Sequence, residues 1–131
     1  MTKMSRFATL TFVGPGEVEA RRLTQLLESL QLFEPDVAKV VIIDDKSGLD
    51  FCTLVPPELL PRVEVVNNSR NGEGYWWQGG LCVGLVDGFK YIAAQDPFDF
   101  VVRLDTDALV VGQFADRIHA KFHSIPTAGL L

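Results

Sequence analysis

The sequence predicts an α/β domain in which helices cover both faces of a mostly parallel sheet. Predicted strands alternate with predicted helices along the chain. The strands are apolar throughout instead of at every second residue, which is typical of strands covered on both faces. The chain has 131 residues, of which 47% are hydrophobic, so it can bury the core of one domain. We therefore expect a single three-layer α/β/α domain over residues 1–131.

The first half of the chain is expected to hold two strands with a helix between them. Residues 7–13, FATLTFV, are β-branched and aromatic and are followed by the turn residues Gly14-Pro15-Gly16, which predicts a buried strand. A helix is predicted over 17–31, because apolar residues recur near the 3.6-residue period. The apolar run AKVVIIDD, 38–45, predicts a second strand that ends at two aspartates. In the irregular stretch after it we expect one turn of helix, at 57–60.

The second half repeats this alternation. RVEVVNN, 62–68, predicts a third strand, and the polar, glycine-containing residues 69–77 predict a loop. A helix is expected over 78–95, where the sequence Asp-Pro ends the apolar period. The apolar residues 99–112, DFVVRLDTDALVVG, predict the fourth strand, and the amphipathic residues 114–125 predict a last helix.

Acidic side chains stand at the predicted carboxyl ends of two strands. Asp44 and Asp45 end the second strand, and Asp105 and Asp107 lie two positions apart in the fourth, where an extended strand directs both to one side. Ligands of such sheets bind beyond the carboxyl ends of the strands, near the point where strand order reverses. Mg²⁺ and Mn²⁺ prefer oxygen ligands, and Mg²⁺ often uses one or two carboxylates together with substrate phosphates. The pattern therefore predicts that Asp105 and Asp107 hold a divalent cation, which in turn holds a diphosphate.

Composition argues against several other classes of function. A net charge of −5 provides no basic surface for a phosphate backbone, so we expect no nucleic-acid partner. Cys52 and Cys82 lack the spacing of zinc or redox motifs. No signal peptide is apparent, and the longest apolar runs are shorter than the ~20 residues of a membrane span. We expect a cytoplasmic protein, and the oligomeric state stays open, a homo-oligomer included.

The order of these motifs resembles a known family. VVIIDDKS, followed by a polar loop and a helix and then by FDFVVRLDTDALV, is similar to the nucleotide-sugar-binding half of GT-A fold glycosyltransferases, especially glycosyltransferase family 2. The likeness runs from about Phe7 to Gly112. It implies transfer of a sugar from a nucleoside diphosphate sugar to an acceptor. By motif, Asp45 would face the base, Asp105 the ribose or diphosphate, and Asp107 the metal, Mn²⁺ or Mg²⁺.

The resemblance also implies further donor contacts. Val13 and Gly14, at the end of the first strand, would approach the nucleoside through backbone groups. Gln78 lies where many relatives place an arginine near the base or the phosphate. The residues themselves add Arg103, the one charged residue between Asp99 and Asp105, which is expected to pair with a strand-end aspartate or to cross to the sheet edge. A buried structural ion pair and a contact with the ligand both stay open for it.

The chain also departs from the family. TFVGPGE replaces the usual Pro, Tyr and Asn after the first strand. The family's second half supplies the acceptor site and, in inverting enzymes, a carboxylate general base, so we expect that base beyond Leu131. The chain is then either part of a longer enzyme or a half-size relative that binds without transferring. Two alternatives remain: a nucleotidyltransferase, for which GPGEVEARR is a weak glycine-rich loop, and a non-catalytic Mg²⁺-binding regulatory or interaction module. The sugar, the base, the acceptor and the stereochemical outcome stay open.

Overall fold

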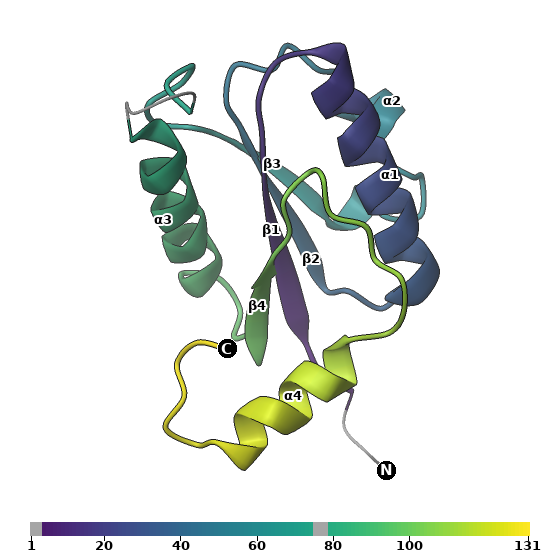
Figure 1. Cartoon of the computed structure of the whole chain (residues 1–131), viewed down its shortest axis with the longest axis vertical. Coiled ribbons are helices and arrows are strands. Elements are labelled where there is room, and N and C mark those ends of the chain that lie inside the picture. Colours follow the sequence, from purple (N-terminus) through teal and green to yellow (C-terminus); the bar gives the residue numbers. More distant parts are fainter. Residues whose placement is uncertain (1–3, 75–78) are drawn as a thin grey trace.

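A central sheet of four parallel strands organises the computed structural model, which describes residues 4–74 and 79–131 (Figure 1). The strands are β1 (Phe7–Val13), β2 (Lys39–Asp44), β3 (Val63–Asn67) and β4 (Phe100–Arg103). Their spatial order is β3-β2-β1-β4, and each neighbouring pair is parallel. The predicted fold class is therefore confirmed, and the first three predicted strands agree with the observed ones within one residue at each end.

Helices cover both faces of this sheet. They are α1 (Glu17–Phe33), α2 (Phe51–Leu54), the 3-10 helix η1 (Leu60–Arg62), α3 (Gly80–Ala93) and α4 (Ala115–Ser124). Figure 1 shows α3 on one side of the sheet and α1 with α2 on the other. Alternate residues of β1 serve the two faces: Phe7 and Val13 belong to the core under α1, whereas Ala8 and Leu10 belong to the core under α3.

Glycines bring α3 close to the sheet. A Cβ atom on Gly84 would lie 2.8 Å from a ring carbon of Phe12, and one on Gly88 would lie 2.7 Å from a methyl carbon of Leu10. Both distances are shorter than van der Waals contact, so a larger residue would push the helix away. The start of α3 also lies close to the carboxyl end of the sheet, because the Asn68 amide donates to the Gly80 carbonyl.

One of the predicted elements is wrong. The fourth strand does not run over 99–112: β4 ends at Arg103, and Ala108 N then donates to Asp105 O at 2.9 Å in a turn. The apolar residues after the turn pack beside α1 instead of pairing with β1, with Val110 buried and Leu109 and Val111 exposed. Apolar character alone does not distinguish such a segment from a strand.

The connection between β2 and β3 contains the helical turn expected at 57–60. Leu59 N and Leu60 N both donate to Pro56 O, at 2.9 Å and 3.1 Å, and η1 continues this turn, whereas α2 was not expected. Asp50 explains α2, because its carboxylate accepts a hydrogen bond from Cys52 N at 3.1 Å and caps the first turn. None of the helices in the described part of the chain has the length and apolar character needed to cross a membrane.

Candidate functional site at the carboxyl edge of the sheet

The order of the strands reverses between β1 and β4. The chain runs outward from β1 through β2 to β3 and then returns to place β4 on the other side of β1. In open parallel sheets the carboxyl edge at such a reversal is where ligands bind. The residues that follow β4 therefore occupy the position at which the fold itself favours a site.

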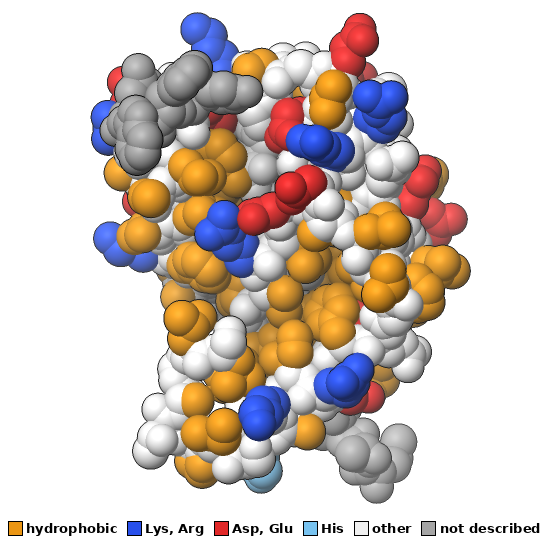
Figure 2. Space-filling model, in the orientation of Figure 1, with side chains coloured by type: hydrophobic (Ala, Val, Ile, Leu, Met, Phe, Trp, Pro, Cys, Tyr) orange, Lys and Arg blue, Asp and Glu red, His pale blue; other side chains and the backbone are white. Residues whose placement is uncertain are grey.

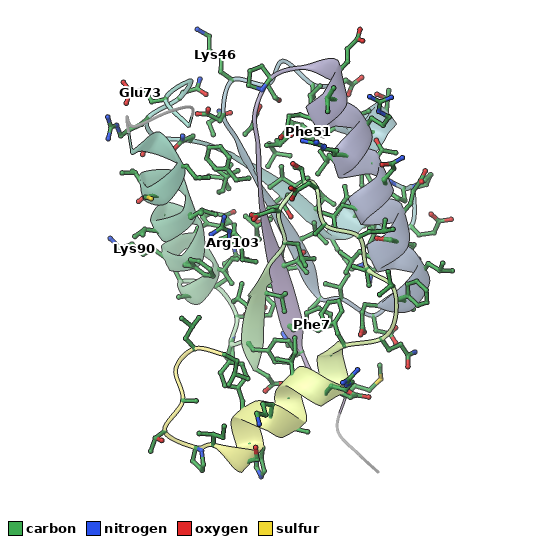
Figure 3. The ribbon with its side chains drawn as sticks, viewed as in Figure 1. Phe7, Lys46, Phe51, Glu73, Lys90 and Arg103 are labelled. Atoms are coloured by element: carbon green, nitrogen blue, oxygen red, sulfur yellow. The ribbon has the colours of Figure 1, made fainter. Side chains whose placement is uncertain are left out.

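These residues form a turn, 105–108, which we call the acidic turn. Asp105 and Asp107 are both exposed in it. Because Asp105 lies in a turn, the expectation that an extended strand directs both carboxylates to one side does not apply. Arg103 Nε donates to Asp105 Oδ1 at 3.0 Å, and Arg103 Nη2 lies 2.9 Å from the same oxygen. Figure 3 shows Arg103 between β4 and α3.

Asp107 differs from Asp105 in its partners. Among the described residues its carboxylate has neither a hydrogen bond nor an ion pair. The pairing of Arg103 with a strand-end aspartate agrees with one of the expectations for that residue, and the pair is exposed rather than buried. Of the two aspartates, Asp107 thus offers a carboxylate that is free for a ligand, whereas Asp105 is shared with a guanidinium.

A third carboxylate approaches the acidic turn from α1. The Thr106 hydroxyl lies 3.1 Å from each carboxylate oxygen of Glu19 and donates to that group. Thr106 is 8% exposed, so this bond is largely shielded from water. Glu19 also lies 3.6 Å from Arg22 on the next turn of α1. Sequence reasoning did not find Glu19, because nothing in its neighbourhood indicates a partner 87 positions away.

Asp45 at the end of β2 is an internal acceptor. It is 2% exposed. Its Oδ1 accepts from Asn68 Nδ2 at 2.8 Å and from Gly72 N at 2.8 Å, and its Oδ2 accepts from Gly74 N at 3.0 Å. The carboxylate therefore holds the loop 68–74 over the end of the sheet. The contact between Asp45 and a nucleoside base stays a prediction.

Asn68 is the second residue that sequence reasoning missed. It is 3% exposed, and its amide also donates to the carbonyl of Gly80, the first residue of α3. Asn68 thus joins β2, the loop and α3. A signal was available, because a polar residue directly after an apolar strand lies at the carboxyl edge of the sheet.

The remaining predicted donor residues lie at the end of β1 or outside the described residues. Val13 is fully buried, and its carbonyl accepts from Asp45 N at 2.9 Å. Gly14 follows it, and a Cβ atom on Gly14 would meet no atom within 4 Å, so open space adjoins the backbone there. Gln78 falls outside the described residues.

The predicted site residues form two groups at one edge. Asp45 follows β2 and the acidic turn follows β4, on opposite sides of β1, which corresponds to about 10 Å across two strand spacings. Arg103 pairs with Leu10 whereas Asp44 pairs with Val13, so the acidic turn is also set back along the strands by up to about 10 Å. An extended ligand is needed to contact both groups.

The acidic turn can supply only part of a metal's coordination. No group of three or more His, Cys, Asp or Glu side chains in residues 4–74 and 79–131 is arranged to hold a metal ion. A Mg²⁺ or Mn²⁺ ion that relies on phosphate oxygens and water needs only one or two carboxylates. The side chains present, Asp107 with Asp105, fit a cation of that kind.

An apolar hollow lies next to this site. It has a volume of about 930 Å³ and lies between the end of α3, β4 and α4, with Phe89, Phe98 and Val101 in its wall and Arg103 beside it. Figure 2 shows apolar side chains gathered on this face below a cluster of charged ones. Asp45, Asp105 and Asp107 do not line the hollow.

Comparisons with known proteins bear on the fold. No protein-family model matches the chain, and no curated protein matches it in sequence. Among solved structures, the crystal structure of S. aureus TarS matches with a TM-score of 0.58 and 19% sequence identity. The match covers 91% of this chain and 20% of that chain, so this chain spans about a fifth of TarS. At this identity the likeness shows the fold, which is consistent with the GT-A type expected from the sequence.

Proposed function

We propose that this chain is the donor-binding part of a glycosyltransferase. In this proposal a nucleoside diphosphate sugar lies along the carboxyl edge of the sheet, and a divalent cation on Asp107 and Asp105 holds its diphosphate. The observation that carries the proposal is the acidic turn at the reversal of strand order, in a fold similar to that of TarS, a glycosyltransferase. Membership of family 2 and the sugar acceptor belong to the proposal as well.

The charges of the site fit this chemistry. The chain carries a net charge of −5, so a diphosphate needs a cation to offset repulsion. Mn²⁺ or Mg²⁺ would also stabilise the charge that develops on the departing nucleoside diphosphate. Asp107 binds the cation most directly, because its carboxylate has no partner among the described residues. Asp105 contributes while it remains paired with Arg103.

The other roles follow the resemblance. Asp45 faces the base, and Val13 and Gly14 approach the nucleoside through backbone groups, with Gln78 nearby. The proposal assigns no general base to the described residues, since the resemblance places that carboxylate with the acceptor site. Donor binding is therefore the part of the activity that this chain can be tested for directly.

Calorimetry tests the proposal. Each common nucleoside diphosphate is titrated into the chain with Mn²⁺ and again with EDTA, and we expect one of them to bind only with the metal. Asp107→Asn should weaken that binding by about tenfold or more, because even residues outside the ligand shell typically cost that much. Asp36→Asn is the matched control, since Asp36 is an exposed aspartate in the connection from α1 to β2. Absence of metal-dependent binding, or equal affinity of Asp107→Asn and the wild type, would refute the proposal.

The same titrations address the two alternatives. A nucleotidyltransferase would prefer a nucleoside triphosphate and release pyrophosphate, and a regulatory module would bind Mg²⁺ without a nucleotide. The residues after β1 argue against the former, because Glu17 and Glu19 take the place of basic residues at the start of α1.

A further inference from the structure

The segment that carries the acidic turn is hydrogen-bonded to α1 at several points. Thr106 donates to Glu19, Val110 N donates to the Ser29 hydroxyl at 3.0 Å, and Ala115 N donates to Glu34 at 2.8 Å. Glu19 and Ser29 lie in α1 and Glu34 is its C-cap residue, so the acceptors follow one another in the same order as their donors along the segment. Figure 1 shows the segment running from the end of β4 along α1 to α4.

The first two acceptors lie about as far apart along α1 as the chain between their donors can reach. Glu19 and Ser29 are ten residues apart in a helix, which is about 15 Å along its axis. Thr106 and Val110 are four residues apart and span at most about 14 Å when fully extended. Part of this stretch is a turn and is shorter still, so the length of the Glu19 side chain closes the difference. The contact between Glu19 and Thr106 therefore holds the acidic turn to α1, whereas the bond from Leu104 N to Leu10 O, at 2.9 Å, holds the residue before the turn to β1.

The burial and the charge of the contact between Glu19 and Thr106 also indicate that it stabilises the acidic turn. Thr106 is 8% exposed although Asp105 and Asp107 on either side are exposed. Glu19 has a 26% exposed side chain, and it accepts a charge-assisted hydrogen bond that water replaces poorly when it is lost. A carboxylate beside two aspartates adds repulsion, which Arg22 offsets from 3.6 Å. The hydrogen bond thus keeps the Glu19 carboxylate near two aspartates, a position that electrostatic repulsion between the carboxylates disfavours.

We propose that Glu19 is a positioning residue for the cation site. By accepting the hydrogen bond of the Thr106 hydroxyl, it fixes the acidic turn, and with it Asp105 and Asp107, beside the first turn of α1. Ser29 holds the other end of the same stretch through Val110. The inference rests on the proposed role of Asp107 in binding the cation, and it assigns Glu19 no contact with that cation.

Variants of both partners test the contact. The probe is Mn²⁺ with inorganic pyrophosphate, and its affinity is measured from the paramagnetic resonance signal of free Mn²⁺. Glu19→Ala and Thr106→Val should each weaken binding about tenfold, and the double variant should bind no more weakly than either single variant. Glu19→Gln and Thr106→Ser should recover most of the affinity, because an amide oxygen and a serine hydroxyl can remake the bond. Glu28→Ala, which removes an exposed carboxylate of α1, is the control.

A metal-free measurement separates this inference from the proposed function. Amide hydrogen exchange of the acidic turn, followed by nuclear magnetic resonance without Mn²⁺, should be faster in Glu19→Ala than in the wild type. If the wild type does not bind the probe, the proposed function fails, and the exchange rates still test the contact. Unchanged exchange in Glu19→Ala would overturn the positioning role, as would loss of binding that Glu19→Gln fails to restore. Thr106→Val tests the same bond if Glu19→Ala does not fold.

Discussion

Replacing Asp45 with asparagine should destabilise the fold far more than the same change at the neighbouring Asp44. The Asp45 carboxylate accepts hydrogen bonds from Asn68, Gly72 and Gly74 and is 2% exposed. An asparagine keeps one oxygen and turns an NH₂ group toward at least one of these donors. A buried donor left without an acceptor costs about 1–3 kcal/mol, and the remaining bonds lose the strength of a charged acceptor.

We therefore expect Asp45→Asn to lower the free energy of unfolding by about 2–4 kcal/mol, or the melting temperature by about 10 °C. Asp44→Asn should cost less than about 1 kcal/mol, because the half-buried Asp44 accepts one bond, from Ser47 N at 2.9 Å, which an amide oxygen can keep. Urea denaturation of both variants isolates the hydrogen bonds, since each variant removes one charge from neighbouring positions. Equal stabilities of the two variants would refute the role assigned to Asp45.

Two further predictions concern the packing and the charges around the sheet. Gly84→Ala should lower the free energy of unfolding by about 1–3 kcal/mol, because the new Cβ would lie 2.8 Å from Phe12. This cost should exceed the gain from the better helix propensity of alanine. A variant that is more stable than the wild type in thermal melts would contradict the close approach of α3. The hydrogen bond from Lys39 and then the one from Tyr91 lower the pKa of Glu64 below 4.5. Glu64 therefore stabilises the fold above the unfolded pKa, and this contribution is lost as the pH falls through the folded pKa. The stability difference between the wild type and Glu64→Gln, measured by urea denaturation, should be at most about 1 kcal/mol at pH 7, because the pair is partly exposed. It should disappear as the pH falls through the folded pKa of Glu64, and a difference that does not change with pH would exclude this origin.

The sequence was sufficient for the sheet because its strands are continuous apolar runs interrupted by turn residues. The same criterion failed after Arg103, where the apolar residues around Val110 pack beside α1 and make no strand. A continuous apolar run indicates that its residues are buried, but it does not indicate whether a strand or a helix covers them. β4 ends at Arg103 because the chain turns at Asp105. The apolar residues on both sides of this turn made it difficult to recognise in the sequence.

The acidic residues of the site were predicted from their positions at strand ends, and the pairing of Arg103 with one of them was among the expectations. Glu19 and the partners of Asp45 were not predicted. Glu19 contacts Thr106 across 87 positions, and Asp45 contacts Gly74 across 29. Such contacts depend on how α1 and the loop 68–74 are placed in the folded chain. This placement produces no pattern among neighbouring residues of the sequence. The strand-end rule identified which carboxylates lie at the edge, whereas only the structure distinguishes the buried Asp45 from the exposed Asp107.

The position of β4 at the margin of the sheet has a consequence for handling the isolated chain. One side of this strand has no neighbouring strand among the described residues, and the apolar hollow of about 930 Å³ opens beside it. Unpaired peptide groups next to apolar surface form a template on which another chain can add a strand. Concentrated preparations should therefore aggregate through β4, and a lysine in place of Val101 would be the first substitution to introduce for solubility.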